Sequence, residues 1–168
     1  FTSLQKEFLN INGVAFLGGC CGTTPEHIKT LSDAVKGVIP KKPSGFLKAS
    51  LASLFNVVPL KQEPAPLLIG ERSNATGSKA FRELLKANDY EGTLSVAQQQ
   101  VRAGAHVIDV SVGFAGRDET GDMNKVVSLY SQKISLPLMP DSTQIKALEA
   151  ALKQIGGRCI INSVNLED

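Results

Sequence analysis

The sequence predicts an α/β protein with a parallel sheet, and two observations carry that prediction. From residue 67 onward, short apolar runs that suit buried strands alternate with longer segments whose apolar residues recur at helical spacing. Each run ends in polar residues, as expected where a strand leaves the packed core. Strict alternation of strand and helix favours parallel strands joined by right-handed crossovers.

The composition is that of an ordinary globular protein and excludes several classes. A chain of 168 residues can bury one core or parts of two domains. The formal net charge is +2 and no basic run exceeds two residues, so we expect no nucleic-acid partner. No apolar run approaches the roughly 18 residues of a membrane span, so we expect no membrane partner either. Three cysteines, two of them adjacent, suit a reducing compartment and predict a cytoplasmic protein.

The first 36 residues predict the tail of a larger α/β unit. Phe1 to Leu9 suits the end of an amphipathic helix that stops at Gly13, and Val14 to Leu17 suits a buried strand. Residues 18–22 follow at its C-terminal end. Residues 24–26, Thr-Pro-Glu, are typical of a helix start with a cap, a proline in the first turn and an acid. Because helical spacing already begins at a first residue that is not Met, we expect a fragment.

Residues 37–66 predict an interdomain linker. Five prolines punctuate this range: Pro40, Pro43, Pro59, Pro64 and Pro66. Proline without apolar periodicity is typical of a semi-rigid linker. We expect one short helical patch within it, from Phe46 to Phe55.

Residues 67–168 predict four strands. The strands are expected at Leu67–Ile69, His106–Ile108, 137–140 and Cys159–Ile161. Helices are expected around Phe81–Leu85, around Leu94–Val101 with a stop at Gly104, along a clear apolar stripe from Met123 to Ile134, and along Ile145, Leu148 and Leu152. A closed eight-stranded barrel takes about 250 residues. If the sheet belongs to such a barrel, about its first half is present.

Polar side chains follow each of the four predicted strands. They are Glu71 and Asn74, Asp109 and Ser111, Asp141, and Asn162. A single one of them suits a helix cap, and Asp141 before Ser142 is a candidate for that role alone. Four in succession favour a ligand site, because strand tips of a barrel converge on one mouth. Carboxylate beside carboxamide suits a flat heterocycle with amide and amine edges.

The adjacent Cys20 and Cys21 have two interpretations. They suit two thiolate ligands of a zinc ion, which prefers sulfur ligands in tetrahedral geometry, or two small buried thiols beside a strand. His27 is a candidate third ligand, with a solvated surface histidine as the alternative. Cys159 is expected in the core.

Two sets of motifs resemble one known family. Residues 18–28, GGCCGTTPEHI, resemble the end of the homocysteine-binding barrel of cobalamin-dependent methionine synthases. The first half of the pterin-binding barrel that follows in that family resembles residues 69–74 (IGERSN) with 76–77 (TG), 104–110 (GAHVIDV), 141–143 (DST) and 161–163 (INS). This second region is also similar to corrinoid methyltransferases and, more distantly, to dihydropteroate synthase.

The resemblance implies a fold and a domain order. The fold would be of the TIM (β/α)8 barrel type, present as partial barrels: the last strand and helix of one and the first four strands of a second. Residues 1–36 would be the C-terminal end of a homocysteine-binding barrel, 37–66 the linker, and 67–168 the N-terminal half of a pterin-binding barrel.

The resemblance also implies a reaction. The protein would move the methyl group of 5-methyltetrahydrofolate via cobalamin to zinc-bound homocysteine, forming methionine. Cys20 and Cys21 would be two of three zinc thiolates, with the third upstream of Phe1, and cobalamin would bind to another domain of the same longer chain. Asn74, Asp109, Asp141 and Asn162 would bind the pterin. Asn162 would also belong to the catalytic network that hydrogen-bonds N5 as the methyl group leaves.

Two departures from the family pattern and three alternatives stay open. Ser111 stands where the family usually has Asn, and Pro140 precedes Asp141 where an apolar residue with an N–H is usual. Such a proline either bends the strand tip or occupies a position that needs no ladder bond. The alternatives are a pterin:corrinoid methyltransferase that does not use homocysteine, a dihydropteroate synthase-like enzyme, and a non-catalytic binding remnant. The fragment alone is expected to be inactive.

Overall fold

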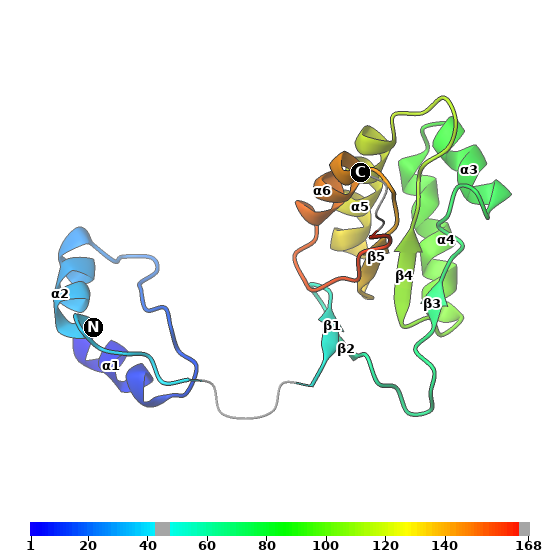
Figure 1. Cartoon of the computed structure of the whole chain (residues 1–168). Helices are drawn as coiled ribbons and strands as arrows, with labels where there is room; N and C mark the ends of the chain where they lie inside the picture. Colours follow the sequence, from blue (N-terminus) through cyan, green and yellow to red (C-terminus); the bar gives the residue numbers. More distant parts are fainter. Residues whose placement is uncertain (43–47, 165–168) are drawn as a thin grey trace. The chain divides into compact units, whose positions relative to one another are not determined.

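The chain forms two compact units in the computed structural model, which describes residues 1–42 and 48–164. The first unit is Phe1–Leu47 and the second is Lys48–Asp168 (Figure 1). The boundary between them falls inside the predicted linker 37–66, of which Pro43 and Phe46 lie outside the described residues. The domain bounds 1–36, 37–66 and 67–168 stay predictions.

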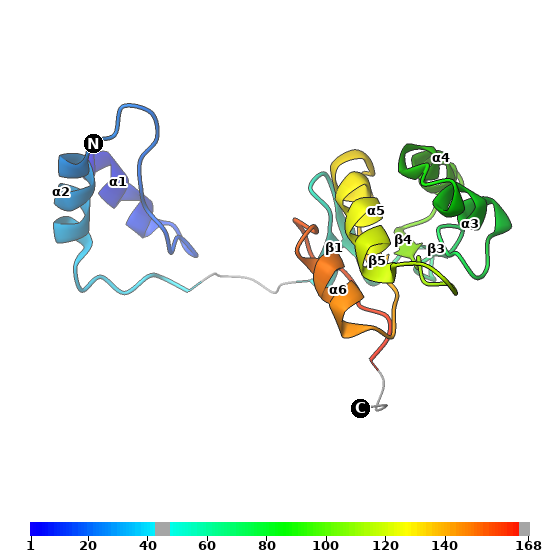
Figure 2. The same ribbon diagram turned by 90° about the horizontal axis from the view of Figure 1, so that it is seen from above.

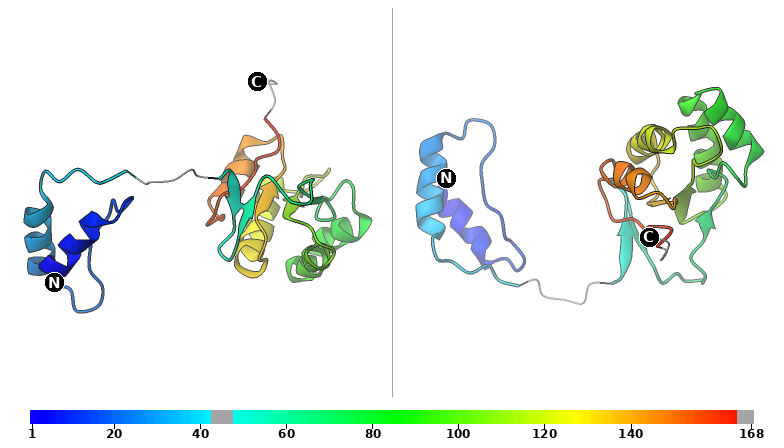
Figure 3. Two further views of the ribbon diagram at one scale, coloured as in Figure 1. Left: turned by 90° about the horizontal axis from the view of Figure 1, so that it is seen from below. Right: turned by 45° about the horizontal axis from the view of Figure 1, so that its top comes forward.

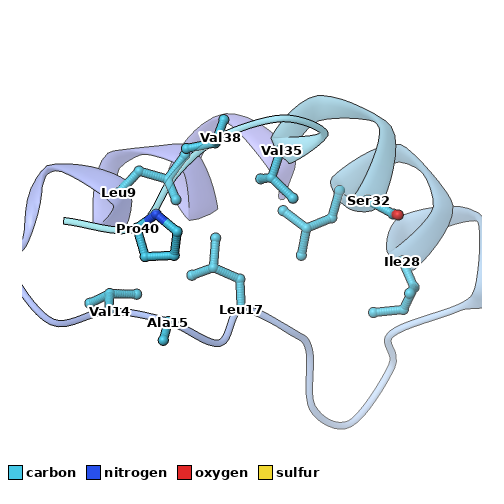
Figure 4. A pocket seen from close by; sticks show the side chains of 10 residues that line it. Leu9, Val14, Ala15, Leu17, Ile28, Ser32, Val35, Val38 and Pro40 are labelled. Carbon is cyan, nitrogen blue, oxygen red and sulfur yellow. The ribbon is translucent and has the colours of Figure 1, made fainter. Parts of the chain in front are cut away.

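The first unit contains the predicted helices. They are α1 (Thr2–Glu7), the 3-10 helix η1 (Phe8–Asn10) and α2 (Pro25–Val35). Leu31 of α2 is buried, and apolar side chains that include Leu9, Leu17 and Ile28 line a cavity of about 270 Å³ between the helices and residues 14–17 (Figure 4). The apolar stripe of α2 therefore faces the rest of its own unit.

The predicted strand Val14–Leu17 is wrong. These residues have no ladder partner within the described part of the unit, and the side chain of Phe16 is 94% exposed. An extended segment becomes a strand only when a neighbouring backbone accepts and donates its hydrogen bonds. The apolar pattern of these residues indicates burial, but it does not show whether a pairing partner exists. No such partner is present in residues 1–42.

The second unit confirms the α/β prediction with an open parallel sheet. Its strands β3 (Ile69–Gly70), β4 (Val107–Val110) and β5 (Leu138–Pro140) lie in the order β3-β4-β5. The helices are α3 (Lys79–Lys86), α4 (Tyr90–Arg102), α5 (Glu119–Lys133) and α6 (Ile145–Leu152). Helix α4 packs on α5 and α5 packs on α6 (Figure 2). The described residues form three parallel strands and no closed barrel.

The sheet has two different faces. Ile108, Val110 and Leu138 pack into one apolar core with the helices, and the Met123 stripe of α5 is buried there as predicted. Val107 and Met139 belong to a second, smaller cluster. Because side chains alternate along a strand, Asp109 and Asp141 project on the same face as Val107 and Met139, away from the helices.

The predicted helical patch Phe46–Phe55 is wrong over residues 48–55, the part that the structure describes. A β-hairpin begins there instead. Strands β1 (Ser50–Ala52) and β2 (Val57–Pro59) pair antiparallel (Figure 3). Leu51 packs against Val107 and Met139. Ala52 also exchanges two backbone hydrogen bonds with Arg158, at 2.9 and 2.8 Å. Tertiary pairing and burial of Leu51 override a weak local helix preference.

Two predicted buried strands differ from expectation. Leu68 and Ile69 are 48% and 37% exposed, because β3 is the edge of the described sheet. Cys159–Ile161 is not a strand, and isolated bridges flank it at Arg158, to Ala52, and at Asn162, to Asp141. Pro140 supplies the physical reason. Its carbonyl accepts from Asn162 N–H at 3.0 Å, so its nitrogen faces the same segment. Because that nitrogen carries no hydrogen, one ladder bond between β5 and this segment is lost.

Helix α6 buries a different face from the predicted one. Ala147 and Ala151 are fully buried, whereas Ile145 is 72% exposed and Leu152 is 40% exposed. The small alanines allow close packing against α5, which decides the buried face. No helix in residues 1–42 or 48–164 has the length and apolarity to cross a membrane.

Candidate functional site

The tips of the strands form a row of polar residues. Isolated bridges join Asn74 to Ser111 and Asp141 to Asn162, and the β4–β5 register that pairs Val110 with Pro140 places Ser111 beside Asp141. The structure therefore brings together all four predicted pterin-binding residues, with Asp109 one step deeper on the same face. These residues come from segments up to 88 positions apart in sequence, and the parallel sheet is what aligns them.

Asp109 is the most unusual group in this row. Its side chain is 2% exposed, Asn74 Nδ2 donates to its Oδ2 at 3.4 Å, and its buried Oδ1 has no hydrogen-bond partner among the described residues. Burial, followed by the negative charge of Asp141, raises the pKa of Asp109 to about 7, against the lowering effect of the Asn74 hydrogen bond. A buried acceptor without a partner is unusual in a folded protein, and it marks Asp109 as a candidate contact for a ligand donor.

Asp141 does not cap the helix that follows it, α6, which was the alternative role that the sequence left open. The Gln144 N–H at the start of α6 is accepted by Ser142 Oγ at 2.9 Å. Burial raises the pKa of Asp141, a hydrogen bond from the Ser111 side chain opposes that shift, and the charge of Glu71 adds to it. The Asp141 side chain is half-buried and lies on the face of the sheet that points away from the helices.

Pro140 does not displace Asp141 from the sheet. The Asp141 N–H donates to Val110 O at 2.9 Å, so pairing with β4 continues past the proline. The nitrogen of Pro140 faces the segment before Asn162 and not β4, as its own carbonyl contact with Asn162 indicates. The proline therefore costs no bond to β4, and the ladder bond that it removes is the one to the segment before Asn162.

Asn74 and Asn162 differ in how their carboxamides are used. Asn74 Oδ1 accepts from Thr76 N–H, Thr76 Oγ1 and Gly77 N–H at 3.0, 2.7 and 3.1 Å. Asn74 thus shapes its own loop and turns its amide nitrogen toward Asp109. Asn162 is half-buried and is held by its backbone, whose carbonyl accepts from Ser142 N–H at 2.8 Å.

Three supporting residues were not predicted. Buried Gln100 accepts from Arg72 N–H at 2.7 Å and donates to Ser73 Oγ at 3.0 Å, which holds the loop that carries Asn74. Glu119 contacts the loop after β5. Arg117, which is partly exposed, makes an ion pair with the buried carboxylate of Asp122, at 2.8 Å. Gln100 has a signal in the sequence, because it lies on the apolar face of a predicted helix; the other two have none.

The first unit carries Cys20 and Cys21 on an exposed turn, so the alternative of two buried thiols is wrong. Their sulfurs are 3.8 Å apart and the Cys20 N–H donates to Thr23 Oγ1 at 2.9 Å. Hydrogen bonds from the backbone and side chain of Cys21 lower the pKa of Cys20.

The other two candidate ligands have different surroundings. His27 is exposed, and its Nδ1 accepts from Thr24 N–H at 3.1 Å, which caps α2. Cys159, predicted in the core, is half-buried, and burial raises the pKa of its thiol. Residues 1–42 and 48–164 contain no group of three His, Cys, Asp or Glu side chains that would hold a metal ion.

Comparison with known proteins assigns the second unit to a family. A sequence model described as pterin binding enzyme matches residues 70–168, which is more than half of the chain. The chain belongs to the pterin-binding enzyme family. In this family member a second model, described as homocysteine S-methyltransferase, matches residues 1–35.

Two curated relatives of this pterin-binding enzyme match along almost its whole length. The chain is 44% identical over 161 residues to the methionine synthase of Mycobacterium leprae (strain TN) and 44% identical over 156 residues to the methionine synthase of Mycobacterium tuberculosis (strain ATCC 25618 / H37Rv). Each match covers 93% of this chain and 13% of the relative. The chain therefore spans about an eighth of the length of these relatives.

Proposed function

We propose that this chain is part of a methyltransferase that moves the methyl group of 5-methyltetrahydrofolate via cobalamin to zinc-bound homocysteine to form methionine. Residues 1–36 are the C-terminal end of a homocysteine-binding barrel, 37–66 a linker, and 67–168 the N-terminal half of a pterin-binding (β/α)8 barrel. The order of the two family matches supports the proposal, as does the 44% identity to two methionine synthases. The match over residues 1–35 favours this reaction over a pterin enzyme that does not use homocysteine.

The observation that carries pterin binding is the unpartnered carboxylate of Asp109 in the polar row. A pterin presents ring N–H and amine donors along one edge, and buried carboxylate oxygens are suited to accept from them. Asp109 Oδ1 is free of protein donors among the described residues, and Asp141 lies beside it without a capping role. Asn74 contributes its amide nitrogen from the next loop.

Asn162 is assigned to the chemical step. The leaving nitrogen N5 is a poor leaving group as a neutral amine, so it needs a proton or a hydrogen bond as its bond to the methyl group breaks. The carboxamide of Asn162 both donates and accepts, and the backbone bonds to Pro140 and Ser142 fix its position beside Asp141. Asn162 therefore orients and polarises N5, while Asp109 and Asp141 hold the ring.

The cysteine pair fits a zinc ion. Two sulfur ligands about 2.3 Å from a tetrahedral zinc lie about 3.8 Å from each other. That separation equals the distance between the sulfurs of Cys20 and Cys21, which are exposed on a turn. Gly19 keeps this turn close, because a Cβ there would lie 2.1 Å from Thr23 Oγ1. Zinc, when bound with a third ligand from outside the described residues, holds homocysteine as a thiolate at neutral pH.

The remaining components lie outside this chain. Cobalamin would be held by another domain of a longer protein and would supply the carrier for the methyl group. The free cysteines suit a reducing compartment, and we place the enzyme in the cytoplasm.

The two halves of the reaction can be separated by one substitution in each unit. In the intact protein, Asn162→Ala should slow demethylation of 5-methyltetrahydrofolate about 100-fold and leave methylation of homocysteine unchanged. Cys21→Ala should have the opposite pattern. Both half-reactions are measured with purified protein in single turnover. Equal demethylation by the wild type and Asn162→Ala would contradict the proposal, and a wild type that demethylates the folate without methylating homocysteine would favour the corrinoid-only enzyme.

A further inference from the structure

A carboxylate outside the predicted site links two of its loops. Glu119 stands in the first turn of α5, after the loop that follows β4. Its Oε1 accepts from Ser142 Oγ and its Oε2 accepts from Gln144 Nε2 at 2.8 Å, and both partners belong to the loop after β5. Both carboxylate oxygens are therefore used between the two loops.

Ser142 connects this carboxylate to the site residues. It is 6% exposed, follows Asp141 directly, and donates its N–H to Asn162 O at 2.8 Å. Its hydroxyl accepts from Gln144 N–H at 2.9 Å and donates to Glu119. Ser142 consequently fixes the backbone directly after Asp141 and ties it to the backbone of Asn162.

Gly113 leaves the space that Glu119 occupies. A Cβ at this position would lie 2.8 Å from both Cδ and Oε2 of Glu119, closer than carbon atoms approach in proteins. Gly113 is two residues beyond Ser111, which lies beside Asp141 in the β4–β5 register. The segment after β4 thus contacts the loop after β5 through Glu119, the first residue of α5.

We propose that Glu119 is a positioning residue that sets the place of the Asp141 and Asn162 side chains relative to Asp109. It acts by holding Ser142 and Gln144 and does not touch the ligand. The proposal rests on pterin binding by the second unit. It adds Glu119 to that site, although within the described residues Glu119 has no polar contact with the four predicted pterin-binding residues. A ligand that contacts carboxylates on two strands loses affinity when the distance between those strands relaxes.

The test is calorimetric titration of the intact protein with 5-methyltetrahydrofolate. Glu119→Ala should weaken binding about tenfold, as loss of a supporting hydrogen bond does at other sites. Glu119→Gln should stay within about threefold of the wild type, because its amide oxygen still accepts from Ser142 and the Gln144 carboxamide can turn its oxygen toward the new amide nitrogen. The control Glu91→Ala removes an exposed carboxylate whose partner is Lys133, at 3.2 Å, and should bind like the wild type.

A double-mutant cycle separates positioning from general stability. In an Asp141→Ala background, Glu119→Ala should cost clearly less than tenfold, because one of the two side chains that Glu119 positions is then missing. The same tenfold cost in both backgrounds, or no cost in either, would overturn the inference while wild-type binding keeps the proposed function intact. Absence of wild-type binding would overturn both. Should Glu119→Ala fail to fold, Gly113→Ala displaces the same carboxylate and is expected to weaken binding to a similar extent.

Discussion

The buried carboxyl of Asp109 should make the second unit less stable as the pH rises toward 8. Its pKa of about 7 in the folded chain exceeds its ordinary value of 3.8, because burial and Asp141 disfavour the carboxylate. Between these values the folded state keeps a proton that the unfolded chain has released, so folding stability is lost with rising pH. The loss approaches about 1.4 kcal/mol per pH unit and ends above pH 7.

Replacing Asp109 by Asn removes this dependence while keeping the shape of the side chain. The amide oxygen of the variant still accepts from Asn74 Nδ2. From pH 5 to pH 8 the wild type should therefore lose about 2.5 kcal/mol relative to Asp109→Asn, which is roughly 70-fold in an opening equilibrium. The exposed helix cap Asp118 provides a control, because Asn caps a helix as well as Asp and the Asp118→Asn variant should follow the wild type.

Hydrogen exchange of the β4 amides measures this difference within a larger protein. Protection factors, corrected for the intrinsic pH dependence of exchange, report the free energy of opening of that strand. Wild-type and Asp109→Asn curves that stay parallel from pH 5 to pH 8 would refute the reasoning, since they would mean that Asp109 titrates alike in the folded and unfolded chain.

Three further predictions concern metal binding and packing. Cys21→Ala should lower the zinc content of the intact protein by about one ion per chain in elemental analysis, whereas Cys159→Ala should leave it unchanged. Arg117→Leu leaves the buried carboxylate of Asp122 without its cation, although Tyr90 Oη still donates to it at 2.7 Å, and should destabilise the second unit by about 2 kcal/mol in urea unfolding, against less than about 0.5 kcal/mol for Lys86→Leu at an exposed pair. Leu51→Ala should cost about 3 kcal/mol in the same assay and expose the inner end of the sheet. Zinc retained by Cys21→Ala, equal losses in the two ion-pair variants, or a neutral Leu51→Ala would each contradict the corresponding assignment.

The helices and the polar strand tips were predictable because each leaves a local signal. The stripe from Met123 to Ile134 repeats at the helical period, and the cap at Thr24 with a following proline marks the start of α2. Asp109 and Asp141 each end an apolar run, and parallel strands of similar length bring such ends together. The resemblance to a pterin-binding barrel predicts the ligand of this row.

What the sequence did not predict depends on partners distant in the chain. The hairpin around Leu51 exists because Val107, Met139 and Arg158 receive it, and nothing near Leu51 announces them. Val14 to Leu17 has the composition of a strand and no neighbouring strand among the described residues. Local pattern indicates burial well and pairing poorly, since pairing is a property of two segments.

The clearest test of the second unit as a pterin site is direct titration of the intact protein with 5-methyltetrahydrofolate. Wild-type protein should bind, and Asp141→Ala and Asn162→Ala should each weaken binding at least about tenfold, because each removes a hydrogen bond to a polar edge of the ring and leaves that edge without its partner. Wild-type affinity in both variants would contradict the account.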